Sequence, residues 1–186
     1  MTKTLPITQA REELTSLVDK AKRKLDEFVI TVNGVPAAVL MSATEFDSWK
    51  ETLDIMSDPQ LMKAIAEGER EIDEGKGQDW DIVKKQLGLW YSTVMRDSKS
   101  DFIMFKLIIS PRAIKQLKLL KFVHKEAVDL ALDDLKSDPE LGKKLKDKLL
   151  GKYSYRIGVY RIIYKVNLKS NIVYIISAGH RSVVYG

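Results

Sequence analysis

The feature that most constrains this chain is a reversal of charge about halfway along its 186 residues. Residues 1–91 hold 12 Lys+Arg and 17 Asp+Glu, a net charge of −5, whereas residues 102–186 hold 17 Lys+Arg and 7 Asp+Glu, a net charge of +10. Such an asymmetry indicates that the basic half binds nucleic acid. It also indicates that the two halves attract each other.

The stretch between the halves, residues 92–101, is polar and shows no periodicity, so we interpret it as a linker. A linker of this length spans at most roughly 35 Å when fully extended. It permits docking of the halves within one chain without requiring it. We therefore expect the chain to divide into four parts, which are residues 1–57, 58–91, 92–101 and 102–186.

Composition excludes several classes of chemistry. There is no cysteine, which excludes disulfides, thiolate zinc sites and thiol catalysis. His124 and His180 are the only two histidines, so we expect neither a metal nor a cofactor. No apolar run has the length of a membrane span, and the first residues lack a signal-peptide core. We therefore expect a cytoplasmic protein with no membrane partner.

Turn and capping signals divide the first half into short elements. Asn33-Gly34 between two apolar runs predicts a two-residue hairpin, Ser42 with Glu45 forms a capping box, and Thr8 is the expected cap of the first helix. The expected order is strand, helix, two strands and two helices, over residues 4–7, 8–24, 28–32, 35–41, 42–56 and 58–74.

Residues 58–91 form a charged segment with few large apolar side chains, in which Gly75 and Gly77 end the expected helix. A segment of this composition commonly folds on a partner. Trp80, Leu87 and Trp90 are the anchors that we expect to dock. The alternative is that these residues pack onto the core of the first half. We favour docking on a partner.

The second half combines helices with strands. We expect one strand, a helical hairpin and three further strands, over residues 102–109, 111–122, 124–136, 153–158, 159–166 and 171–177. A lysine-rich stretch separates the helices from the last strands. Two helices followed by an antiparallel sheet make this half α+β.

Arginine, tyrosine and histidine gather towards the C-terminus. Cleavage of RNA without a metal requires deprotonation of a 2′-OH, stabilisation of charge on the phosphate and protonation of the leaving oxygen. Lysine, arginine, tyrosine and histidine can perform all three tasks. The interleaved candidates are Arg156, Tyr160, Arg161, Tyr164, His180, Arg181 and Tyr185.

Three motifs stand out within residues 106–185: Ser110-Pro111-Arg112-Ala113, Tyr160-Arg161-Ile162-Ile163-Tyr164 and Gly179-His180-Arg181. In these motifs the segment resembles the RelE/ParE toxin superfamily. The RelE branch implies an endoribonuclease that cuts mRNA on the ribosome. The ParE branch implies an inhibitor of DNA gyrase instead.

The resemblance also implies roles for particular residues. Arg161 and Arg181 would hold the scissile phosphate, and Tyr185 would assist proton transfer or stack on a base. Some relatives use a glutamate base where this sequence has Gly142-Lys143-Lys144, and Ser154 stands where some have a catalytic lysine, which leaves the general base open. The remaining candidates are Lys152 and His180 for catalysis and Arg156, Lys146 and Lys148 for RNA binding.

Residues 5–87 resemble the Phd/YefM antitoxin family, most specifically in Ile30-Thr31-Val32-Asn33-Gly34 and Ala37-Ala38-Val39-Leu40-Met41-Ser42. The family implies a homodimer formed by the N-terminal α/β region, which binds operator DNA and represses its own promoter. Arg11 would contact DNA, with Asn33 in support. The family's C-terminal segment wraps its toxin, in agreement with the docking expected for residues 58–91.

Together these features predict a type II toxin–antitoxin pair in one chain. The toxin half would act on the ribosome and mRNA, and the antitoxin half would neutralise it, in cis or in trans, and bind operator DNA. Two alternatives remain open. One is a gyrase inhibitor with its antitoxin, and the other is a DNA-binding autorepressor whose toxin domain is inactive.

Overall fold

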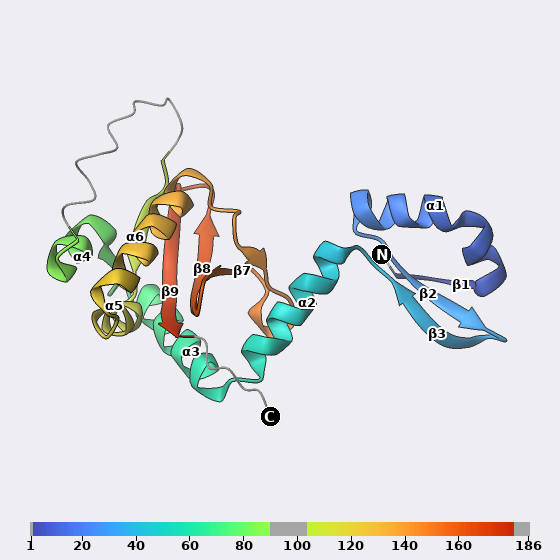
Figure 1. Ribbon diagram of the computed structural model, residues 1–186, viewed down its shortest axis with the longest axis horizontal. Coiled ribbons are helices and arrows are strands. Elements are labelled where there is room, and N and C mark those ends of the chain that lie inside the picture. The colour runs from blue at the N-terminus through green and yellow to red at the C-terminus, as the bar shows by residue number, and fades with distance from the viewer. Residues whose placement is uncertain (1, 90–103, 181–186) are drawn as a thin grey trace. The chain divides into compact units, whose positions relative to one another are not determined.

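The computed structural model describes residues 2–89 and 104–180 (Figure 1). The chain divides into two compact units, Met1–Lys50 and Glu51–Gly186. We call them the N-terminal unit and the C-terminal unit. The division falls inside helix α2 (Ala43–Met56). Within the described part of the chain, no helix is both long and apolar enough to cross a membrane.

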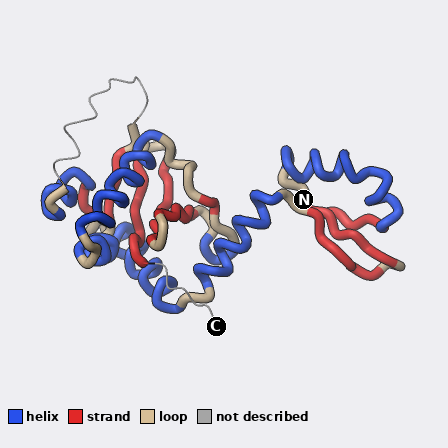
Figure 2. The backbone as a smooth tube through the Cα atoms, in the orientation of Figure 1, coloured by secondary structure: helices blue, strands red, loops and turns tan. Residues whose placement is uncertain are grey.

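The N-terminal unit is a three-stranded sheet with one helix packed on it (Figure 2). The sheet has the order β1-β2-β3, in which β1 is parallel to β2 and β2 is antiparallel to β3. Leu5, Ala10, Leu17, Ala21 and Phe28 form its small buried core. Its elements are β1 (Thr2–Pro6), α1 (Ile7–Lys24), β2 (Glu27–Val32), β3 (Val35–Leu40) and the first part of α2.

Local signals in this unit are largely confirmed. Asn33 and Gly34 adopt φ values of 52° and 80°, as a two-residue hairpin turn requires. The Ser42 hydroxyl accepts a hydrogen bond from the Glu45 amide at 3.1 Å. The cap expected at Thr8 is wrong, because β1 leads directly into α1 at Ile7 and Pro6 takes the cap position without a side-chain hydrogen bond. Thr8 therefore lies inside the first turn.

The C-terminal unit holds a six-stranded sheet of order β4-β5-β9-β8-β7-β6. Its pairings are antiparallel except for β5 and β9, which are parallel. The elements after α2 are α3 (Pro59–Asp73), β4 (Gln78–Asp79), α4 (Trp80–Leu87), β5 (Lys106–Ile109), α5 (Pro111–Lys118), α6 (Phe122–Ser137), β6 (Lys143–Lys144), the 3-10 turn η2 (Asp147–Leu149), β7 (Lys152–Ile157), β8 (Tyr160–Asn167) and β9 (Ile172–His180).

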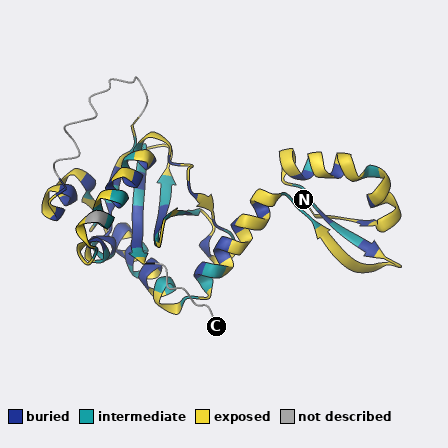
Figure 3. Cartoon of the chain, viewed as in Figure 1, coloured by how far each residue is buried: buried dark blue, intermediate teal, exposed yellow. Residues whose placement is uncertain are grey.

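Each face of this sheet has its own apolar cluster. Ile162 and Ile175 belong to a cluster with residues of α4, α5 and α6. Ile163 and Ile176 belong to a second cluster with Ile55 of α2 and Ile65 of α3. Because successive strand residues point to opposite faces, α5 and α6 cover one face, and α3 with the end of α2 covers the other. The buried strands are visible in dark blue in Figure 3.

Residues 51–89 thus wrap around the rest of the C-terminal unit, and we call them the wrapping segment. The helix α3 approaches β9 so closely that a Cβ atom on Gly68 would lie 2.0 Å from the Ile176 carbonyl oxygen. The strand β4 extends the sheet by pairing with β5. The expected α+β class, with a helical hairpin packed on a mainly antiparallel sheet, is confirmed.

Candidate functional site

One face of β7 and β8 carries four cationic side chains, Lys152, Arg156, Arg161 and Lys165, which we call the cationic face. Their spacing in each strand places them on one side of the sheet. The strand register sets Arg156 opposite Arg161, and Lys152 opposite Lys165. Like charges directly opposite each other destabilise a sheet. Sheet stability therefore does not explain this arrangement.

Glu51 and Asp54, at the end of α2, form ion pairs with the two arginines. The Arg161 Nε lies 3.0 Å from Glu51 Oε1, and its Nη2 lies 2.7 Å from Asp54 Oδ2. The Nε contact lacks hydrogen-bond alignment, so its attraction is mainly electrostatic. Arg156 contacts both carboxylates and lies 3.1 Å from Asp54 Oδ2. Arg161 is only 3% exposed, so its charge depends on these partners.

The two lysines of the cationic face are also paired. Lys152 Nζ lies 2.9 Å from Glu69 Oε1, and Lys165 Nζ lies 2.9 Å from Asp73 Oδ1, both on α3. The buried Ser154 hydroxyl donates a 2.6 Å hydrogen bond to Glu51 Oε1. Every member of the cationic face therefore meets a carboxylate of the wrapping segment.

Three further candidates from the toxin-like sequence, Lys146, Lys148 and His180, do not belong to the cationic face. The Lys146 backbone amide donates to Thr52 Oγ1 at 2.9 Å, and Lys148 is exposed. His180 lies opposite Tyr160, and their rings are 5.5 Å apart. By strand alternation both point away from the face that holds Arg161. Arg181 and Tyr185 fall outside the described residues.

Tyr160 and His180 border a pocket of about 480 Å³ between α3, α5 and the ends of β8 and β9. The centroid of the Tyr160 ring also lies 5.0 Å from that of the His124 ring. Arg112 and Gln116 also line the pocket. Both histidine rings thus lie close to the Tyr160 ring, whose strand position turns it away from Arg161.

Tyr164 has a structural role, because its hydroxyl makes hydrogen bonds to another part of the backbone. Its hydroxyl donates to the Pro139 carbonyl at 2.9 Å and accepts from the Gly142 amide at 3.0 Å. Burial raises the pKa of Tyr164 well above its ordinary value, so the phenol stays protonated. These contacts join β8 to the turn before β6.

The expected anchors Trp80 and Leu87 are both buried, at 1% and 8% exposure, in the apolar cluster that contains Leu107, Leu117 and Leu132. They therefore pack against the C-terminal half. Trp90 lies outside the described residues, as does the linker expected at 92–101. Among the residues that the structure describes, no group of three or more His, Asp or Glu side chains is placed to hold a metal ion.

Sequence motifs did not identify Glu51, Asp54 or Glu69 as site residues. The reversal of charge indicated only that acids of the first half meet bases of the second. The partner-docking segment was expected to begin at residue 58, whereas the paired carboxylates begin earlier, at residue 51. Glu51 and Asp54 are three residues apart on α2, a spacing that places both on one helix face and could have identified them.

The comparisons with known proteins agree with this two-part organisation. A family described as antitoxin Phd_YefM of type II toxin–antitoxin systems matches residues 2–75, and one described as the ParE toxin of the type II system parDE matches residues 107–185. The antitoxin RelF of Mycobacterium tuberculosis is 35% identical over 85 residues, which cover 46% of this chain and 91% of RelF.

The toxin RelG of the same organism is 36% identical over 59 residues, which cover 31% of this chain and 68% of RelG. Among solved structures, the toxin–antitoxin complex RelBE2 from Mycobacterium tuberculosis has 34% sequence identity and a TM-score of 0.45, with 48% of this chain and 97% of that chain covered. The chain therefore belongs to the Phd/YefM antitoxin family in its N-terminal part and to the RelE/ParE toxin superfamily in its C-terminal part. It joins a type II antitoxin and a toxin in one polypeptide.

Proposed function

We propose that the C-terminal half is a ribosome-dependent mRNA endonuclease and that the wrapping segment holds it inactive. The observation that carries this proposal is the cationic face, in which two like-charged pairs stand opposite each other and every cation meets a carboxylate. Such a concentration of positive charge suits a polyanion. The wrapping segment occupies it with carboxylates.

Arg161 and Arg156 are well suited to hold a phosphate, because a guanidinium presents a planar fork of donors to two oxygens. In the inhibited state, the carboxylate oxygens of Glu51 and Asp54 take the place of phosphate oxygens. RNA bound at Arg161 would satisfy the same buried charge. Inhibitor and substrate would therefore compete for one site.

Several roles complete the proposed reaction. Arg181 would share the phosphate with Arg161, and Tyr185 would transfer a proton or stack on a base. Lys152 and His180 are the further candidates for acid–base chemistry, and they project from opposite faces of the sheet. Arg156, Lys146 and Lys148 would bind the RNA backbone.

For the N-terminal unit we infer a homodimer that binds operator DNA and represses its own promoter. A unit of this size forms a marginal core alone, and this one leaves several large apolar side chains exposed. Exposed positions are yellow in Figure 3. Arg11 on α1 and Asn33 at the hairpin turn are exposed and available to DNA. The exposed apolar side chains include Leu14, Val18, Val35, Val39 and Phe46.

A second candidate target is DNA gyrase, because the family matched over residues 107–185 is described as the ParE toxin. The two targets predict different results for the purified C-terminal half. A gyrase inhibitor would block supercoiling and leave mRNA intact. A ribosome-dependent nuclease would cut mRNA during translation and leave supercoiling unaffected.

The nuclease proposal is tested by expressing residues 104–186 in cells, with the Arg161→Ala variant and the full chain as matched controls. We expect growth arrest and translation-dependent mRNA cleavage from residues 104–186 alone. The variant should lose both effects, since it lacks the central phosphate ligand. Absence of arrest and of mRNA cleavage from the unsubstituted half would refute the nuclease.

A further inference from the structure

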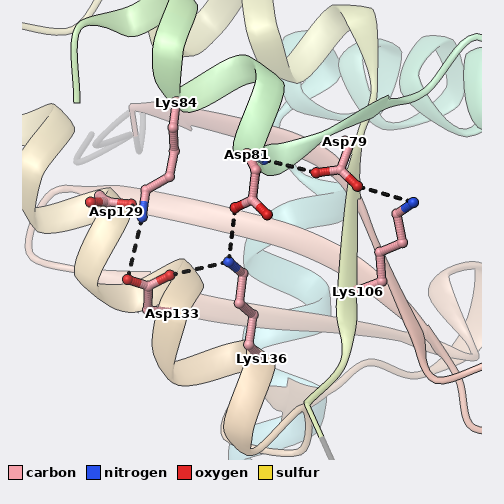
Figure 4. Close-up of polar contacts among 7 residues, drawn as sticks. All are labelled: Asp79, Asp81, Lys84, Lys106, Asp129, Asp133 and Lys136. Atoms are coloured by element: carbon pink, nitrogen blue, oxygen red, sulfur yellow. Dashed lines mark hydrogen bonds and ion pairs between the residues drawn. The ribbon is translucent and has the colours of Figure 1, made fainter. Parts of the chain in front are cut away.

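The pattern of charge pairing reverses at α4. The acids of the C-terminal half gather on and beside α6, whereas its cationic face lies on β7 and β8. The acidic α3 meets the cationic face, but α4 presents lysine to α6 (Figure 4). The wrapping segment therefore matches both a basic and an acidic surface.

Lys84 of α4 is at the centre of this second contact. Its Nζ lies 2.7 Å from Asp129 Oδ1 and 3.5 Å from Asp133 Oδ2. Lys136 Nζ links the same Asp133, at 3.5 Å, to Asp81 of the wrapping segment, at 3.2 Å (Figure 4). Lys84 and Asp129 are 6% and 1% exposed, so both charges are almost entirely removed from solvent.

A buried ion pair adds little net affinity, because removal of both charges from water offsets their attraction. Loss of one partner is costly, because the other charge stays buried. Asp129 and Asp133 also stand one helical turn apart, where like charges repel each other. An incoming helix that lacks a cation at this point would therefore be disfavoured, which is how a specific interface rejects wrong partners.

We propose that the buried pair of Lys84 and Asp129 is a recognition determinant, which makes the toxin half accept a wrapping helix with lysine at this position and reject one with an apolar residue there. The proposal rests on the neutralising role of the wrapping segment. It assigns recognition to α4 and leaves occupation of the cationic face to α2 and α3.

Hydrogen exchange of the α4 backbone amides in the full chain tests this assignment. Lys84→Met should lower their protection by about 100-fold or more, because Asp129 loses its closest cation. Asp129→Leu should lower it by at least about ten-fold, because Asp133 still lies near Lys84. The double variant Lys84→Met/Asp129→Leu should return to within about ten-fold of the unsubstituted chain, since neither charge then remains.

Lys85→Met is the matched control, because Lys85 is the neighbouring residue on α4 but is exposed. It should leave protection unchanged. Unchanged protection in Lys84→Met, or a double variant no better protected than the weaker single variant, would overturn the proposal. The exchange measurement reports docking of α4 alone, so a toxin half without nuclease activity would not alter its result.

Discussion

At the scale of single residues, Glu51 connects more of the site than any sequence motif indicated. Its carboxylate contacts Ser154, Arg156 and Arg161 at once and is itself 2% exposed. A carboxylate in this position satisfies a buried arginine and separates the charges of two opposed strands. It therefore couples the stability of the chain to the proposed inhibition.

Replacement of this residue should be costly. Glu51→Ala removes the more deeply buried of the two carboxylates that pair with Arg161, and we expect the free energy of unfolding of the full chain to fall by about 3–5 kcal/mol. Chemical denaturation measures it. Glu74→Ala, which removes an exposed ion pair with Lys76, should leave the same quantity nearly unchanged. Equal losses of unfolding free energy in the two variants would show that the buried contact of Glu51 with Arg161 stabilises the chain no more than an exposed ion pair does.

Gly68 gives a second prediction at this scale. Glycine within a helix is normally less stable than alanine by about 0.5–1 kcal/mol. Here the added methyl carbon would lie 2.0 Å from the Ile176 carbonyl oxygen, so Gly68→Ala should instead destabilise the chain by about 1–3 kcal/mol. Thermal unfolding provides the measurement. A rise in melting temperature would contradict the close docking of α3 on β9.

At the scale of elements, Asp79 joins β4 to α4, because it is the last residue of the strand and the cap of the helix. Burial opposes ionisation of Asp79, but a hydrogen bond from the Asp81 amide and the ion pair with Lys106 outweigh it, and the net effect lowers the pKa of Asp79 below its ordinary 3.8. The carboxylate accepts from Asp81 N at 2.9 Å and lies 3.0 Å from Lys106 Nζ.

The sign of the resulting pH dependence follows from linkage. A carboxyl whose pKa is lowered on folding stabilises the fold at pH values above its unfolded pKa, and this contribution is lost as the pH falls through the folded pKa. The loss should therefore begin below about pH 4, where the unfolded carboxyl titrates. Asp79→Asn should lower the free energy of unfolding at neutral pH. It should also make that free energy fall less steeply as the pH is lowered into the acidic range, which urea unfolding measures. An unchanged steepness of this fall would contradict this role.

Elements with strong local signals were predictable from sequence. The hairpin at Asn33-Gly34 and the start of α3 after Asp58 depend on neighbouring residues alone. The strand β4 was not predicted, since Gln78 and Asp79 are extended through pairing with β5 and carry no strand pattern themselves. The first toxin-like helix ends at Lys118, earlier than the expected residue 122, because a turn at Leu119 and Leu120 follows it.

At the scale of the whole molecule, the distribution of charge along the sequence predicted the two-part organisation of the chain. It predicted only some of the residues of the candidate site. Strand alternation could have placed Arg156, Arg161 and Lys152 together, since it depends on sequence spacing. Their carboxylate partners could not be assigned, because the register of α2 and α3 on the sheet is set by contacts such as Gly68 on Ile176. His180 joined the catalytic candidates by residue type, and its strand position turns it away from Arg161.

The central claim is that Glu51 and Asp54 inhibit a nuclease by occupying its phosphate site. The most direct measurement is mRNA cleavage on translating ribosomes by residues 104–186, with increasing amounts of residues 1–91 added either unsubstituted or as Glu51→Ala/Asp54→Ala. We predict cleavage by the toxin half alone, suppression by the unsubstituted antitoxin half, and suppression by the variant only at about 100-fold higher concentration or more. Equal suppression by both antitoxin halves, or no cleavage by the toxin half alone, would contradict the account.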